Sequence, residues 1–244
     1  MESVTFQSDG LKIRGNLHLP RKNSPCVVSL HGLEGDKDRG KWPKIASELH
    51  RGGYACLRFN FRGCGEGRER SEGKFEDLTL TGRIRDYKSA LDFLQNSGRV
   101  DPDRIGVIGS SLGGMVAIAA EEKRVKAMVT LAAPYKIPRY ERPLIPKKVG
   151  KFYELPSGRK FKQKFYEDMR GYDLRESVRK TPPILIIHGD SDEIVPLSHA
   201  QILFNHAREP KKLEVIPGAD HVFSNPRHLR KVARLALGWF DTYL

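Results

Sequence analysis

The feature that most constrains the fold of this chain is a series of short apolar runs that alternate with segments of helical periodicity. Residues 26–30 are almost continuously apolar and stop at His31-Gly32, a pattern typical of a strand covered on both faces. Further runs of this kind lie at residues 54–61, 105–109, 127–132, 184–188 and 213–216. The sequence therefore predicts a sheet with a buried centre.

Apolar stripes at helical spacing lie between these runs. They consist of Trp42, Ile45 and Leu49; of Leu80, Ile84, Tyr87, Leu91 and Leu94; of Leu197, Ala200, Phe204 and Ala207; and of Leu229, Val232, Ala236, Trp239 and Tyr243. Strands that alternate with helices require right-handed crossovers, so we predict an α/β fold with a mostly parallel sheet and helices on both faces. Alternation around Asp9-Gly10 adds an antiparallel hairpin. We expect one domain over residues 1–244, with about eight strands.

Length and cysteine usage bound the class of protein. A chain of 244 residues buries a core without disulfides or a structural metal. Cys26, Cys56 and Cys64 include no CxxC pair, which argues against a disulfide framework and a zinc site. No apolar run reaches the length of a membrane helix, and the first residues do not resemble a secretory signal. We expect a cytoplasmic protein without a membrane partner.

Residues 134–180 break the alternation. They contain fourteen Lys or Arg, six Asp or Glu, five prolines and eight aromatic residues, so they carry +8 of the net charge of +13. The stretch follows a predicted strand at the sheet edge where sites form, so we interpret it as a basic cap or lid inserted over the site. A disordered linker is the alternative, but linkers are poor in aromatic residues.

One predicted strand passes directly into a helix through Gly109-Ser110-Ser111-Leu112-Gly113. A sharp, strained turn at this place would hold the side chain of Ser111 out at the sheet edge, and the glycines would let neighbouring backbone pass closely. Ser110 has no flanking glycines and is the weaker candidate. We therefore predict Ser111 as a nucleophile.

A serine nucleophile needs a histidine base. His221 lies in a loop after the last predicted strand, on the edge where the site is expected. His31 and His188 each precede a glycine at a strand end, where we expect structural roles. We predict His221 as the base, while the carboxylate of the adjacent Asp220 is expected to point elsewhere.

An acid must orient the base, and three carboxylates follow the run at residues 184–188. We choose Asp192, with Asp190 and Glu193 as the alternatives, because serine, acid and histidine then follow in the order expected of a hydrolase on such a sheet. Two backbone N–H groups should stabilise the oxyanion. We predict those of Leu112, after the nucleophile, and Leu33, in the loop at residues 31–35.

Five segments resemble, in order, successive signatures of the α/β-hydrolase family: residues 31–35, 61–67, 109–113, 188–196 and 220–221. The chain resembles its small serine esterases, including the cinnamoyl or feruloyl type, and more distantly the catalytic domain of acylaminoacyl peptidases. The resemblance implies the α/β-hydrolase fold, a triad of Ser111, Asp192 and His221, a small-molecule ester substrate, and no metal or other cofactor. It also makes strands at Cys26 and Cys56 neighbours, which leaves a disulfide between them open.

Two other functions use the same features differently. A thioesterase or an acylaminoacyl-peptidase-like serine peptidase would use the same triad, because the pocket and not the triad selects the acyl compound. A non-catalytic protein could instead bind an anionic ligand, such as single-stranded nucleic acid, on the basic and aromatic residues 134–180. We favour the carboxylesterase and expect no nucleic-acid partner.

Overall fold

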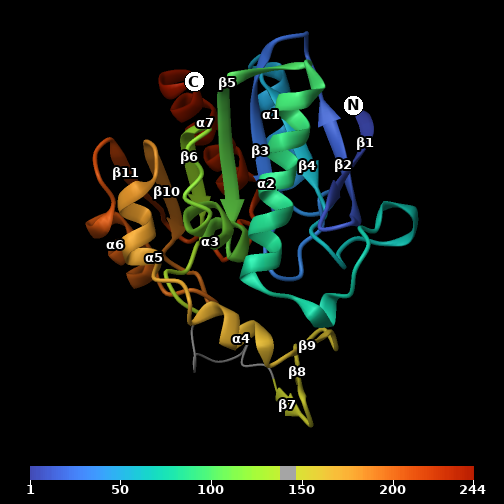
Figure 1. Ribbon diagram of the computed structural model, residues 1–244. Helices are drawn as coiled ribbons and strands as arrows, with labels where there is room; N and C mark the ends of the chain where they lie inside the picture. The colour runs from blue at the N-terminus through green and yellow to red at the C-terminus, as the bar shows by residue number, and fades with distance from the viewer. Residues whose placement is uncertain (138–146) are drawn as a thin grey trace.

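The computed structural model describes residues 1–137 and 147–244. Its main sheet contains β1 (Glu2–Ser8), β2 (Leu11–His18), β3 (Ser24–Leu30), β4 (Ala55–Phe59), β5 (Val100–Ser110), β6 (Val125–Leu131), β10 (Ile184–Gly189) and β11 (Lys211–Ile216). They lie in the order β1-β2-β4-β3-β5-β6-β10-β11 (Figure 1). β2 pairs antiparallel with β1 and β4, and the other neighbours are parallel. The predicted hairpin and mostly parallel sheet of eight strands are confirmed.

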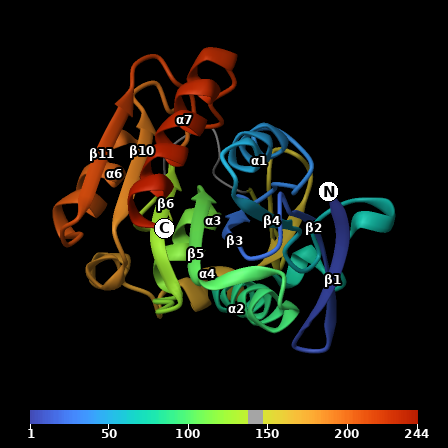
Figure 2. The same cartoon turned by 90° about the horizontal axis from the view of Figure 1, so that it is seen from above.

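Helices cover both faces of this sheet (Figure 2). α1 (Trp42–Arg51) and α7 (Pro226–Tyr243) pack on one face, and α2 (Leu80–Ser97), α3 (Leu112–Ala119) and α6 (Leu197–His206) pack on the other. Successive strand side chains point to opposite faces, so Val27 faces α1 and α7 while Val28 faces the second layer. Both faces of the central strands are therefore buried, as their continuous apolar sequence predicted. No helix in the described residues is long and apolar enough to cross a membrane.

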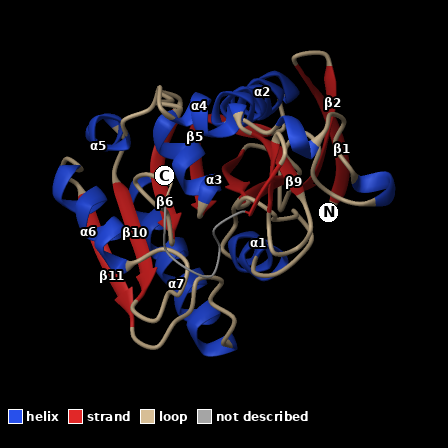
Figure 3. Ribbon diagram, turned by 90° about the horizontal axis from the view of Figure 1, so that it is seen from below, coloured by secondary structure: helices blue, strands red, loops and turns tan. Residues whose placement is uncertain are grey.

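The carboxyl ends of the parallel strands meet at one edge of the sheet. In Figure 1 the arrowhead of β5 points down toward this edge, and Figure 3 looks at the molecule from that side. The loops that follow β3, β5, β10 and β11 carry the predicted oxyanion, nucleophile, acid and histidine residues. The three cysteines lie in the body of the fold as free, buried thiols, so Cys26 and Cys56 do not pair.

The insertion is defined as residues 134–180, and its described residues lie at the same edge (Figure 1). Its residues 138–146 fall outside the described part of the chain. The rest contains a small antiparallel sheet of β7 (Lys147–Val149), β8 (Phe152–Glu154) and β9 (Lys160–Lys162), followed by α4 (Lys164–Met169), α5 (Leu174–Ser177) and a 3₁₀ turn, η3 (Val178–Lys180). The sequence had not predicted these elements, because each is shorter than a strand or helix with a readable period.

Aromatic rings and contacts with the body fix the described part of the insertion. The Phe161 ring packs against those of Tyr153 and Phe165, at centroid distances of 5.8 Å and 5.1 Å. The guanidinium of Arg159 lies 3.5 Å from the ring centroid of Phe75, in η2 (Phe75–Asp77) of the body. Residues 147–180 are thus an ordered layer rather than a linker.

Candidate active site

The turn between β5 and α3 holds Ser111 in a strained conformation, with φ of +53° and ψ of −121°. Few residues other than glycine adopt a positive φ, and such strain is common at functional sites. The surrounding glycines make the turn possible. A Cβ on Gly113 would lie 2.1 Å from the carbonyl oxygen of Leu30, and one on Gly109 would lie 2.5 Å from that of Gly113. The Gly-x-Ser-x-Gly spacing therefore has the steric origin that the sequence predicted.

His221 and Asp192 meet across the ends of β10 and β11. The Nδ1 atom of His221 lies 2.9 Å and 3.0 Å from the two carboxylate oxygens of Asp192. Gly189 permits this approach, because a Cβ there would lie 2.0 Å from the carbonyl oxygen of Ala219. A carboxylate only accepts hydrogen bonds, so Nδ1 carries a proton, and in the neutral imidazole Nε2 is then the atom with the lone pair. His221 thus has the tautomer of a general base.

The side chain of Asp192 is fully buried and is held by several donors. Its Oδ1 accepts the backbone N–H groups of Ile194 and Val195, at 2.9 Å and 2.8 Å. His188 Nε2 lies 3.2 Å from Oδ2 and 2.8 Å from the carbonyl oxygen of Val195, so this nitrogen is protonated. Burial alone would raise the pKa of the Asp192 carboxyl, but the hydrogen bonds from His188 and His221 bring it below its ordinary value. The carboxylate therefore stays ionised beside the imidazole.

The loop after β3 passes close to the nucleophile. A Cβ on Gly32 would lie 3.4 Å from the Cβ of Ser111, and Gly35 N–H donates to Gly32 O in a tight turn that contains Leu33. Leu112 is the first residue of α3, where backbone N–H groups have no acceptor within the helix. Leu112 thus follows Ser111 directly, and the turn that contains Leu33 lies close to it.

Two buried side chains that the sequence did not single out for this role fix the turn. Arg83, on α2, is fully buried and donates to the carbonyl oxygens of Gly32, at 2.9 Å, and Leu33, at 2.7 Å. His31 accepts the N–H of Phe61 at Nε2 and lies 2.8 Å from Gly32 O through Nδ1. Burial, with the nearby Arg83 charge, lowers the pKa of His31 to about 3. This histidine is neutral and structural, as predicted.

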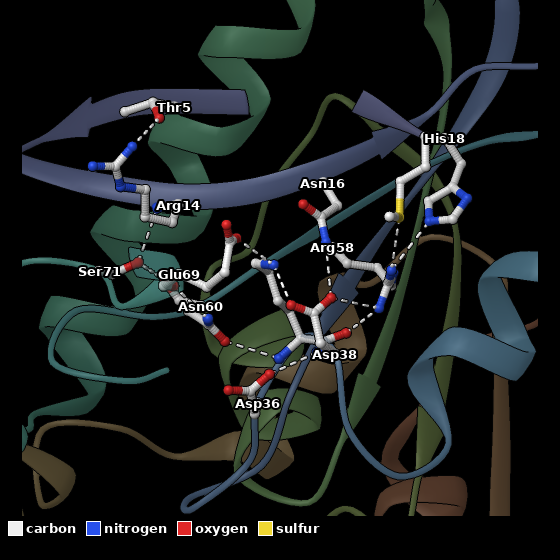
Figure 4. A network of polar contacts seen from close by, with 12 residues as sticks. Thr5, Arg14, Asn16, His18, Asp36, Asp38, Arg58, Asn60, Glu69 and Ser71 are labelled. Atoms are coloured by element: carbon white, nitrogen blue, oxygen red, sulfur yellow. Dashed lines mark hydrogen bonds and ion pairs between the residues drawn. The ribbon is translucent and has the colours of Figure 1, made fainter. Parts of the chain in front are cut away.

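A network of polar contacts holds the next part of this loop (Figure 4). Asp38 accepts from the amide of Asn16 at 2.8 Å and lies 3.3 Å from the guanidinium of Arg58. The fully buried ammonium of Lys37 contacts Asp38, while the Lys37 backbone N–H donates to the Asn60 side chain at 2.8 Å. The loop of residues 31–41, called the floor loop below, is thereby fixed to β2 and β4.

A cavity of about 1010 Å³ opens at this edge of the sheet. Ser111, His221, Leu33 and Leu112 all line it. The insertion supplies further lining side chains, Leu155, Arg159, Phe161, Phe165 and Tyr166. The structure therefore brings the predicted nucleophile, base and oxyanion residues to one cavity, with the predicted acid buried behind the base.

The alternatives named from the sequence have other contacts. The carboxylate of Asp190 accepts the N–H of Gly218 at 2.6 Å, and that of Asp220 accepts the N–H of Ser224 at 2.8 Å. Neither holds the His221 ring. Within the described residues, no group of three or more His, Cys, Asp or Glu side chains is placed to hold a metal ion.

Comparisons with known proteins agree with this fold. The profile of the prolyl oligopeptidase family matches residues 44–244. The uncharacterized protein YfhR of Salmonella typhi is 28% identical over 240 residues, which cover 91% of this chain and 74% of that protein. The structure is similar to that of Est1E from Butyrivibrio proteoclasticus with bound ferulic acid, with a TM-score of 0.86, 26% identity and coverage of 98% and 99% of the two chains. It also resembles the esterase domain of a Rhodothermus marinus protein, with a TM-score of 0.76, 29% identity and coverage of 99% and 98%. The expected α/β-hydrolase fold is confirmed.

Proposed function

This chain belongs to the prolyl oligopeptidase family of α/β-hydrolases, and on that premise we propose that it is a serine hydrolase that cleaves carboxylic esters through an acyl-enzyme. One observation carries the proposal. The imidazole of His221 is fixed by Asp192 in the tautomer of a base and lines the same cavity as the strained Ser111. A surface histidine would have neither the buried acid nor the cavity.

The proposed reaction uses the same groups in both half-reactions. The Ser111 hydroxyl attacks the ester carbonyl while His221 Nε2 accepts its proton. The N–H groups of Leu33 and Leu112 stabilise the oxyanion. His221 then protonates the leaving alkoxide, and a water molecule, deprotonated by the same nitrogen, releases the acid and restores Ser111. Asp192 stays ionised throughout and stabilises the imidazolium.

The aromatic lining of the cavity and the similar esterase structures favour ester over peptide substrates. Aromatic side chains of the insertion line it, and two esterase structures above 25% identity share the fold. A bound ferulic acid in one of these relatives makes aromatic esters, such as hydroxycinnamates, the substrates to test first. We further propose that the insertion serves as the cap, because residues 155–166 supply one wall of the cavity.

A serine peptidase that acts on acylated peptides is the second candidate, and the match to the prolyl oligopeptidase family favours it. The same triad serves both reactions. The two are separated by comparing kcat/KM for methyl ferulate and p-nitrophenyl butyrate with that for an N-acetyl amino acid p-nitroanilide. We expect hydrolysis of the esters and little of the anilide.

The nucleophile is tested with Ser111→Ala on p-nitrophenyl butyrate. We expect kcat to fall about 10³-fold or more, as in other triads that lose the nucleophile. Ser110→Ala is the matched control, because Ser110 precedes Ser111 in the same sequence motif, and it should lose far less. Circular dichroism checks that both variants are folded. Equal rates for Ser111→Ala and the native chain would refute the proposal.

A further inference from the structure

The cavity contains a buried cation that the proposed mechanism does not use. Lys41, the last residue of the floor loop, is only 9% exposed and lines the cavity. Its Nζ donates to the hydroxyl of Ser110 at 2.9 Å and lies 5.6 Å from the ring centroid of Phe223. Ser110 and Phe223 flank the proposed nucleophile and base in sequence, so the ammonium lies between the two loops that carry them.

No carboxylate neutralises this charge by direct contact. Within residues 1–137 and 147–244, none lies within 4.0 Å of Lys41 Nζ. Asp220 and Asp192 attract it from farther away, but Asp220 already accepts from the Ser224 N–H and Asp192 from His221. Buried cations are normally paired, because an isolated charge out of water is costly.

The remaining donors of Lys41 define the chemistry of a ligand. An ammonium has three N–H donors, and the hydroxyl of Ser110 uses one of them. Lys41 itself is buried, and the cavity that it lines also contains the apolar side chains of Trp42, Val195, Phe223 and Leu229. In such surroundings a charge-assisted hydrogen bond to an anionic oxygen is stronger than one at the surface.

We propose that Lys41 forms a subsite for an anionic group, so that this enzyme prefers esters that carry a carboxylate. This inference rests on the proposed esterase function and names its substrate class. It differs from attraction by the net charge of the protein, because it requires direct contact with one side chain inside the cavity.

Protonation of Lys41 gives the subsite a pH dependence. Burial lowers the pKa of the ammonium to about 8, against the opposing attraction of Asp220 and Asp192. The subsite is therefore cationic below this pH and neutral above it. The preference for an anionic ester should be greatest near pH 7 and should fall as the pH rises through about 8, while the rate for a neutral ester follows the triad alone.

The test compares matched ester pairs in about 0.5 M salt, which screens long-range attraction. The p-nitrophenyl monoester of adipic acid is measured beside p-nitrophenyl hexanoate, and 4-carboxyphenyl hexanoate beside phenyl hexanoate. The first pair places the anion on the acyl side and the second on the alcohol side. The ratio of kcat/KM within each pair cancels any general loss of activity. Spontaneous hydrolysis is subtracted.

We expect the native protein to favour the anionic ester in at least one pair. Lys41→Gln keeps a polar side chain that reaches Ser110 but removes the charge, and Lys41→Met removes both; each should lower that ratio about tenfold. Lys44→Met is the control, because Lys44 lies one turn along α1, outside the cavity lining, where it pairs with Glu48. It removes an equal charge and should keep the ratio.

Unchanged ratios in the Lys41 variants would overturn the proposal. Where a variant is too unstable to assay, a native protein that shows no preference for the anionic ester in either pair would overturn it. Failure of the native protein to cleave any of the four esters would instead refute the esterase function. Calorimetric titration with adipate then tests the subsite alone. Weaker binding to Lys41→Gln than to the native protein would support it, and equal binding would refute it.

Discussion

The floor loop and the insertion border the same cavity but are held by different forces. The floor loop is fixed by polar contacts of buried side chains, in which Arg83, His31 and Lys37 bind backbone groups or charged side chains. The described part of the insertion is held by stacked rings and by exposed ion pairs such as that of Lys162 with Asp77. Buried polar contacts require exact partners, whereas rings and surface charges tolerate exchange. We therefore expect the floor loop, which carries the predicted oxyanion residue Leu33, to tolerate fewer substitutions than the insertion.

Glycine-to-alanine substitutions should give the largest difference in stability between the surroundings of the nucleophile and the insertion. Gly113→Ala places a methyl group 2.1 Å from the carbonyl oxygen of Leu30, so the turn that holds Ser111 must move. We expect a loss of about 3 kcal/mol or more in the free energy of unfolding, with little soluble, active protein. Gly171→Ala, in the insertion, meets its nearest atom at 3.4 Å and should change stability by less than about 1 kcal/mol. Urea unfolding of both variants checks this contrast.

Substitution of one arginine beside each region should affect different kinetic parameters. Arg83→Met frees the carbonyl oxygens of Gly32 and Leu33 and should lower kcat about 10- to 100-fold, with a smaller change in KM, because the oxyanion donors lose their fixed positions. Arg159→Met, on the insertion, should act mainly on KM. Steady-state kinetics on p-nitrophenyl butyrate, on folded variants, separates the two parameters. A change in KM alone for Arg83→Met would contradict the assigned role.

Removal of one charged side chain should give the smallest effects. The loss of stability should again be larger in the floor loop than in the insertion. Asp38→Ala leaves the buried cations Lys37 and Arg58 without this partner and should cost about 2 kcal/mol, less than a fully buried pair because Asp38 itself is 40% exposed. Lys162→Ala removes an exposed pair with Asp77 and should leave the urea midpoint within error. Equal shifts would show that burial does not distinguish these regions.

The sequence predicted the main sheet well because each central strand is a buried apolar run with a clear end. It also predicted the pairing of His221 with Asp192, since both residues follow parallel strands and the carboxyl ends of such strands share an edge. The elements of the insertion could not be predicted. Strands of three residues, such as β8 (Phe152–Glu154), carry no period, and packing of Tyr153 on Phe161 fixes them instead.

The buried charged residues were also not identified from the sequence, because a sequence alone does not distinguish a buried arginine from an exposed one. For Arg83, however, the sequence contains a signal of burial. This residue lies three residues after Leu80 and four before Tyr87, on the apolar stripe of α2, where a solvated side chain would not be expected. Lys41 has no such signal in the sequence, since it precedes α1 in a loop rich in charges. Its burial and its contacts with Ser110 and Phe223 are visible only in the fold.

The direct pairing of β6 with β10 has a consequence for how such a protein can change over time. The chain leaves the main sheet after Leu131, at the end of β6, and returns to it at Ile184, the start of β10. These two strands are nevertheless hydrogen-bonded neighbours. The described part of the intervening segment adds no strand to the eight-stranded sheet. A gene that exchanges this segment for another of different length keeps every ladder bond of the scaffold. If the insertion is the cap proposed above, new substrate ranges can be acquired, in evolution or by grafting in the laboratory, while the strands that carry the candidate site stay in place.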